Sequence, residues 1–140
     1  MSLVVDSSMT LAWCFEDERT DHATAVLRQV AEQGALVPSL WHLEVANGLQ
    51  TAIRRGRITP TFRDSTLPDL GTLSISVDDQ TEHLAWSTTL QLAERFQLTL
   101  YDAAYLELAH RTGLVLASLD GALCRAATAL GVPLIGQGAQ

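Results

Sequence analysis

The chain has 140 residues, 47% of them hydrophobic, and a formal net charge of −7. This length suits one domain with a single core, and the apolar fraction excludes an intrinsically disordered chain. No apolar run approaches the roughly 18 residues that a membrane-spanning helix needs, and the N-terminus reaches Asp6 without the basic region of a secretory signal. We therefore expect a cytoplasmic protein with no membrane partner.

Short apolar runs alternate with helical patterns along the whole chain. Buried strands are predicted at residues 3–5, 35–38, 73–77, 114–117 and 132–135. Helices are expected between them at about 8–15, 20–33, 40–53, from 60 onward, and at about 80–95, 99–110 and 120–130. Ser39, Thr59 and Thr99 precede three of these helices and suit their N-caps.

The predicted strands rarely alternate polar and apolar residues, which is typical of a parallel sheet with helices on both faces. The sequence contains no repeat, low-complexity tract or linker. It therefore predicts a single α/β domain over residues 1–136, with about five parallel strands flanked by helices, and a short tail at 137–140.

The basic and sulfur-containing residues narrow the function further. All nine basic residues are arginine, and the absence of lysine excludes phosphate-binding loops, Schiff-base enzymes and phosphoacceptor receiver domains. Ser8 stands where a haloacid-dehalogenase-type phosphatase needs a second aspartate, and no GxGxxG motif indicates a dinucleotide site. Cys14 and Cys124 have no metal-type spacing, which predicts two buried thiols in a reducing compartment.

Four acidic residues occupy positions that are typical of a site at a sheet edge. Ligands of open α/β sheets bind beyond the carboxyl ends of the strands. Asp6 follows the first strand, Asp120 follows the fourth, and Asp102 lies in the first turn of a helix. Glu44 lies in an apolar helix after the second strand, where a partly buried carboxylate needs an arginine or a shared cation as its partner.

Two interpretations of these acids remain open at this stage. Asp6, Asp102 and Asp120 each suit a helix N-cap, which stabilises a helix by about 1 kcal/mol. Alternatively, clustered carboxylates repel one another until a cation binds, and oxygen ligands favour Mg²⁺ or Mn²⁺ over zinc. Such an ion neutralises charge on a phosphoryl group and lowers the pKa of water, so the second interpretation predicts phosphoryl chemistry.

Four sequence blocks resemble those of the PIN-domain ribonucleases, specifically the VapC-type toxins of bacterial and archaeal toxin–antitoxin pairs. They are residues 4–8 (VVDSS), 38–47 (PSLWHLEVAN), 100–109 (LYDAAYLELA) and 116–120 (LASLD). The resemblance spans essentially the whole chain. It implies a three-layer PIN-like fold and a Mg²⁺- or Mn²⁺-dependent endoribonuclease that hydrolyses single-stranded RNA and leaves a 5′-phosphate. It also implies a small antitoxin partner and a homodimer.

The resemblance also assigns roles to individual residues. Its acidic quartet falls on Asp6, Glu44, Asp102 and Asp120, with Asp6 and Asp102 matching the principal metal ligands. The resemblance and the spacing place further residues near the site: Ser7, Ser8, Asn47 and Ser118, the last of which stands where many members carry threonine.

Three arginines, Arg54, Arg55 and Arg57, lie together at the end of the Glu44 helix. They either complement the negative end of the helix dipole or contact the phosphates of RNA or the antitoxin. A rival of another class is a catalytically silent PIN-like module that acts through protein binding. The intact acid quartet argues against that rival, because loss of activity usually costs a metal ligand.

Overall fold

A parallel five-stranded sheet forms the centre of the computed structural model, which describes residues 2–135. The strand order is β3-β2-β1-β4-β5. The strands are β1 (Leu3–Val5), β2 (Ala35–Val37), β3 (Ile75–Val77), β4 (Leu116–Ala117) and β5 (Leu134–Ile135). The middle strand, β1, pairs on both sides and its three side chains are fully buried, so it lies at the centre of the core.

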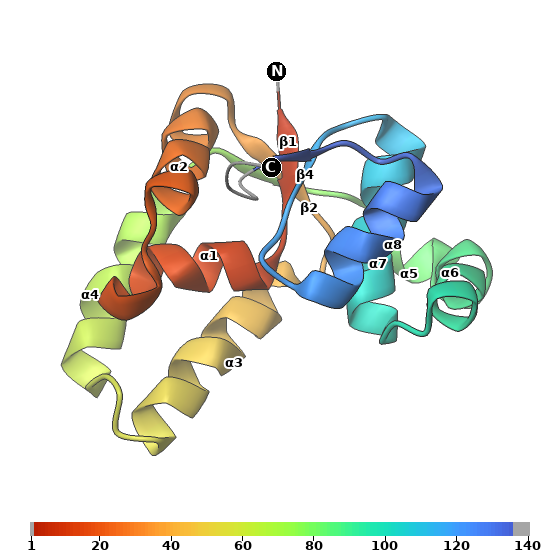
Figure 1. Ribbon diagram of the computed structural model, residues 1–140. Helices are drawn as coiled ribbons and strands as arrows, with labels where there is room; N and C mark the ends of the chain where they lie inside the picture. Colours follow the sequence, from red (N-terminus) through yellow and green to blue (C-terminus); the bar gives the residue numbers. More distant parts are fainter. Residues whose placement is uncertain (1, 136–140) are drawn as a thin grey trace.

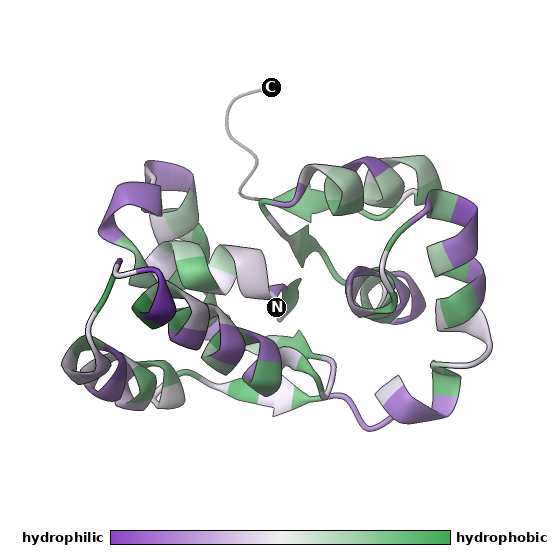
Figure 2. Ribbon diagram, turned by 90° about the horizontal axis from the view of Figure 1, so that it is seen from below, coloured by the Kyte–Doolittle hydropathy of each residue, from purple (hydrophilic) through white to green (hydrophobic). Residues whose placement is uncertain are grey.

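Helices flank this sheet, as Figure 1 shows. They are α1 (Ser7–Cys14), α2 (Asp21–Gln33), α3 (Trp41–Arg54), α4 (Pro60–Gly71), α5 (Thr81–Leu84), α6 (Thr88–Phe96), α7 (Leu100–Thr112) and α8 (Gly121–Leu130), with a short 3₁₀ turn, η1 (Glu16–Glu18). In Figure 2 the mostly apolar strands lie between two groups of helices. The predicted α/β class and parallel sheet are confirmed.

Two local predictions are wrong. The helix expected at about 80–95 is two helices, α5 and α6, because the backbone of Ser87 leaves the helical region at φ −122° and ψ −99°. Ser39 does not cap α3: its backbone N–H donates to the Thr81 hydroxyl at 3.0 Å, and Leu40 precedes the helix instead. Both differences arise from local backbone geometry and a contact distant in sequence, which hydrophobic periodicity does not record.

The remaining expectations concern the ends of the chain, the thiols and the membrane. The tail expected at 137–140 and the domain boundary at 136 lie outside the described residues. Cys14 and Cys124 are both buried, as expected. Within residues 2–135, no helix has the length and apolar character that crossing a membrane requires.

The carboxyl ends of β1 and β4 lie side by side and define the functional edge of the sheet. The backbone N–H of Asp6 donates to the carbonyl of Ala117 at 3.1 Å, so the two chains leave the sheet together. From β1 the chain continues to β2 on one side, whereas β4 lies on the other side. Ligands of open α/β sheets bind where the strand order reverses in this way. The first turns of α1, α7 and α8 gather at this edge (Figure 1).

A partly buried charge network contacts the last turn of α7. Arg111 donates to Glu107 at 2.7 Å on the same helix and to Asp78, which follows β3, at 2.8 Å. The side chains of Glu107 and Asp78 are buried or nearly so, whereas that of Arg111 is 32% exposed. Removing Arg111 would leave two buried carboxylates without their partner, which is costly. The network therefore links the end of α7 to the segment after β3.

Helix α3 offers a test of this packing with two leucines of opposite exposure. Leu49 is fully buried, whereas Leu43 is 76% exposed. We expect Leu49→Ala to lower the free energy of unfolding by about 2–5 kcal/mol, because it leaves a cavity in the core. Leu43→Ala should change it by less than about 0.5 kcal/mol. Urea unfolding followed by circular dichroism measures both, and equal losses would contradict the described face of α3.

Candidate metal centre

Asp6 is the most buried of the four acids, with 2% of its surface exposed. Its carboxylate accepts hydrogen bonds from the hydroxyl of Ser8 at 2.8 and 2.9 Å, from that of Ser118 at 2.6 Å and from the backbone N–H of Met9 at 2.9 Å. Burial nevertheless raises the pKa of Asp6 to about 6, with a smaller contribution from the negative charge of Asp102. These donors orient the carboxylate without fully offsetting the cost of its burial.

Asp102 is electrostatically coupled to the other three acids. Its pKa is also raised to about 6, first by burial and then by the charges of Asp120 and Glu44. The neighbouring Thr99 hydroxyl partly opposes this rise in pKa. Asp102 therefore sits near the centre of mutual carboxylate repulsion, and a cation placed there would relieve it.

The partner of Glu44 is a residue that the sequence interpretation missed. Glu44 is partly buried, as expected, and its Oε1 accepts a hydrogen bond from the Tyr105 hydroxyl at 2.7 Å. Tyr105 lies on α7, one turn after Asp102, and is fully buried. In the sequence it resembles an ordinary core aromatic. The i, i+3 spacing from Asp102 was the available signal, because residues at that spacing share a helix face.

The remaining predicted site residues fall on the elements around this edge. The Ser118 hydroxyl accepts from the backbone N–H of Asp120 at 3.0 Å, and the Ser8 hydroxyl accepts from that of Leu119 at 3.0 Å. These bonds join the segment after β4 to the start of α1. Asn47 lies on α3, one turn after Glu44, and is exposed.

The capping alternative is confirmed for two of the three aspartates. Asp6 caps α1 by accepting from Met9, and Asp120 caps α8 by accepting from the N–H of Leu123 at 2.8 Å. Asp102 is not a cap, because Thr99 occupies that position in α7 and accepts from the N–H of Asp102. A carboxylate uses only part of its acceptor capacity for a cap, so capping and ion binding are compatible at Asp6 and Asp120.

Among residues 2–135, no three His, Cys, Asp or Glu side chains form a ready-made shell around one point. Mg²⁺ does not require such a shell, because it keeps several of its waters and is usually held by one or two carboxylates. The donor set at this edge consists of carboxylates and hydroxyls, and burial, together with a smaller contribution from like charge, raises the pKa of both Asp6 and Asp102. Oxygen ligands and carboxylates that repel one another both fit a divalent cation such as Mg²⁺ or Mn²⁺.

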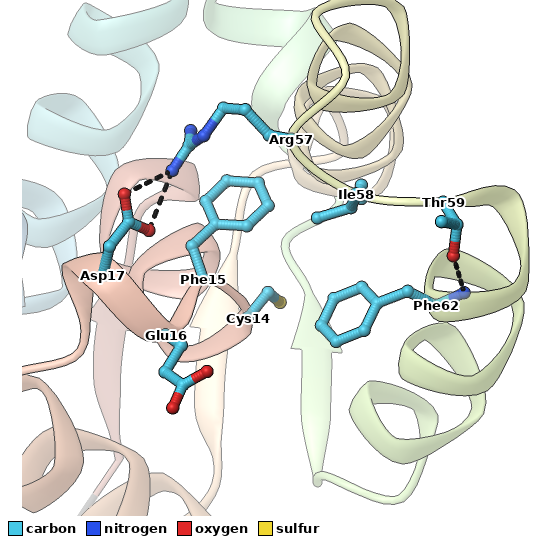
Figure 3. A pocket seen from close by; sticks show the side chains of 8 residues that line it. All are labelled: Cys14, Phe15, Glu16, Asp17, Arg57, Ile58, Thr59 and Phe62. Carbon is cyan, nitrogen blue, oxygen red and sulfur yellow. Dashed lines mark hydrogen bonds and ion pairs between the residues drawn. The ribbon is translucent and has the colours of Figure 1, made fainter.

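The three arginines differ in their surroundings. Arg57 donates to Asp17 and Glu18 at 3.0 Å and packs over the Phe15 ring at 4.4 Å from its centroid, beside a pocket of about 710 Å³. Figure 3 shows Arg57 with Asp17 and Phe15 at this pocket. The Arg54 guanidinium donates to the Thr51 hydroxyl at 3.4 Å. Arg55 forms no ion pair within the part of the chain that the structure describes.

A groove of about 420 Å³ connects Arg55 with the acidic edge. Its lining includes Ser8 and Asp120, then Leu11 and Gly48 where α1 meets α3, and finally Arg55. The helices approach closely at Gly48, where an added Cβ would collide with the Leu11 side chain. Arg54 does not contribute to this lining, so of these two arginines only Arg55 faces the groove.

The raised pKa of Asp6 predicts how stability depends on pH without metal. The folded carboxyl binds its proton more tightly than the unfolded one, so its stabilising effect is complete below about pH 4 and is lost as pH rises through about 6. Between pH 4 and pH 7, the free energy of unfolding of wild type should therefore fall by on the order of 3 kcal/mol relative to that of Asp6→Asn. Urea unfolding in EDTA at several pH values measures this difference.

Asp69→Asn is the matched control, because Asp69 is exposed. Its pH profile should follow that of wild type. Adding Mg²⁺ at pH 7 should restore stability to wild type and not to Asp6→Asn, because only the charged site binds the ion. Parallel profiles for Asp6→Asn and wild type would contradict the described burial of Asp6.

Comparisons with known proteins identify the family of the chain. The sequence profile of the PIN domain matches residues 3–129. Ribonuclease VapC3 of Pyrobaculum aerophilum is 33% identical over 135 residues, which cover 95% of this chain and 100% of that protein. Ribonuclease VapC3 of Mycobacterium tuberculosis is 32% identical over 109 residues, which cover 76% of this chain and 75% of that protein.

A solved structure supports the fold independently. The crystal structure of PAE2754 from Pyrobaculum aerophilum aligns with a TM-score of 0.65 and covers 90% of this chain and 86% of that one. Its sequence identity is 22%, so this likeness concerns the fold alone. The resemblance noted in the sequence is thereby confirmed: the chain belongs to the PIN-domain family, and its curated relatives are VapC-type ribonucleases.

Proposed function

We propose that the protein is a metal-dependent endoribonuclease that hydrolyses phosphodiester bonds in single-stranded RNA. The observation that carries this proposal is the electrostatic coupling of Asp102 to Asp6, Glu44 and Asp120 at the carboxyl edge of the sheet. Such a set of acids is costly to a fold that has no cation to bind. The names of the VapC relatives support a ribonuclease rather than another phosphodiesterase.

Each acid has a separate part in the proposed site. Asp6 and Asp102 would hold Mg²⁺ or Mn²⁺, with Ser8 and Ser118 fixing the Asp6 carboxylate. When bound, the ion would neutralise charge on the phosphoryl group and lower the pKa of water. Glu44 and Asp120 would hold a second ion or orient the attacking water. Their charges would also favour deprotonation of that water. Ser7 and Asn47 complete the proposed surroundings of these acids.

The groove between α1 and α3 offers the RNA a path to these acids. The net charge of −7 opposes an approach by a polyanion. Arg55 is exposed, has no acidic partner among the described residues and lines the groove that reaches Asp120. Arginine binds phosphate through two parallel hydrogen bonds. We therefore assign the phosphate contact to Arg55 ahead of Arg54.

The proposed biological role is that of a toxin in a toxin–antitoxin pair. It rests on the VapC names of the relatives and on the sequence resemblance. In this role the protein acts in the cytoplasm, a small antitoxin protein silences it, and two copies form a homodimer.

Cleavage of labelled single-stranded RNA by the purified protein tests the activity. We expect cleavage with Mg²⁺ or Mn²⁺, none with EDTA, and a loss of at least about a hundredfold in kcat for Asp6→Asn, whose fold circular dichroism should find intact. Asp69→Asn should retain full activity. Full activity in Asp6→Asn would refute the site, and no cleavage of any RNA by folded, antitoxin-free protein would favour the silent binding module.

RNA affinity tests the role of Arg55. Arg55→Ala should weaken binding of an uncleaved RNA and reduce the slope of log K against log salt by about 1, the value for one lost phosphate contact. Arg54→Ala removes the same charge from the neighbouring residue, which does not line the groove. It should therefore change affinity less. Equal effects of the two variants would indicate general electrostatic attraction and no specific contact.

A further inference from the structure

Tyr105 places a single polar atom at the end of a fully buried ring. The residue is 0% exposed, and its hydroxyl donates to Oε1 of Glu44 at 2.7 Å. A phenylalanine would fill the same volume without burying a hydroxyl, which needs a partner in the core. Within residues 2–135, the Tyr105 hydroxyl is the only side-chain group that hydrogen-bonds the Glu44 carboxylate. The orientation of that carboxylate therefore depends on this one contact.

The contact between Tyr105 and Glu44 joins two helices at the functional edge. Tyr105 lies in α7 and Glu44 lies in α3. Ser8 holds Asp6 in a similar way, through a side-chain hydrogen bond from its hydroxyl. A hydroxyl group thus contacts each of these two acids of the proposed site.

We propose that Tyr105 is a positioning residue that holds the Glu44 carboxylate toward the metal centre. This inference rests on the proposed function, in which Glu44 acts on an ion or on the attacking water. Glutamate has three rotatable side-chain bonds, and a partly exposed one samples several rotamers unless it is held. Groups that orient the ligands of a metal typically contribute 10- to 100-fold to its affinity or to activity.

Tyr105→Phe tests the proposal, because it removes the hydroxyl and keeps the ring. We expect Mn²⁺ affinity, measured by isothermal titration calorimetry, to fall by about tenfold or more. In RNA cleavage, kcat should fall by a similar factor with little change in KM. Tyr101→Phe is the matched control, because it removes a phenolic hydroxyl from the same helix at a position that is 60% exposed. It should leave both measurements unchanged.

A double-mutant cycle separates positioning from a general effect on the core. In the Glu44→Ala background, Tyr105→Phe should no longer change Mn²⁺ affinity, because the carboxylate it orients is gone. A crystal structure of the wild-type protein with Mn²⁺ keeps the test decisive if Tyr105→Phe fails to fold. A Glu44 carboxylate that has left the Tyr105 hydroxyl in that structure would overturn the positioning role.

Each outcome bears on one of the two proposals. Wild-type Mn²⁺ affinity and kcat in folded Tyr105→Phe, with only a lower melting temperature, would overturn the positioning role. An equal loss from Tyr105→Phe with and without Glu44 would also overturn it. If wild-type protein binds Mn²⁺ but cleaves no RNA, the proposed function fails, and the calorimetric cycle still decides whether Tyr105 positions Glu44.

Discussion

The buried carboxylate of Asp6 is the constraint on which the rest of the site depends. It lies where the central strand ends, and at 2% exposure it has lost nearly all contact with water. Hydroxyls from two segments replace that water: Ser8 follows β1 and Ser118 follows β4. The same hydroxyls also accept the N–H groups of Leu119 and Asp120. Keeping one charge in place thus fixes the relative position of the loops after both strands.

This arrangement lowers the stability of the folded protein at neutral pH and keeps its carboxylates available to a cation. Two carboxyls have pKa values near 6, which means that the folded protein opposes their ionisation at neutral pH. The opposing contribution comes from an apolar core centred on β1 and from the Asp78–Arg111–Glu107 network that contacts α7. Asp102 and Tyr105 both lie on α7, so this network also helps to position the two residues relative to the sheet. The contacts that stabilise the fold and the acids that destabilise it therefore share one helix.

The apolar runs and the acidic residues that follow them predicted the parallel sheet and its acidic edge, because both are local features of the sequence. Contacts between distant residues were not predictable in this way. The spacing from Asp102 places Tyr105 on the face of the site, but no nearby residue reveals that its hydroxyl meets Glu44, 61 positions earlier in the chain. Similarly, Arg57 differs from Arg55 only because Asp17, 40 positions away, folds back onto it. The break between α5 and α6 depends on one backbone conformation that the amphipathic pattern spans without a change.

The double use of Asp6 and Asp120 as helix caps has a practical consequence. An asparagine side chain caps a helix about as well as an aspartate, because its amide oxygen accepts the same N–H. Exchanging one oxygen for an NH₂ group at these positions therefore removes the charge and leaves the start of the helix intact. At Asp120 this exchange separates the helix cap from the charge, whereas at Asp6 it also alters the hydrogen bond from Ser118, because an NH₂ group donates and does not accept. An amide variant of this kind would suit the capture of intact bound RNA, which could then be recovered and sequenced to identify the natural target.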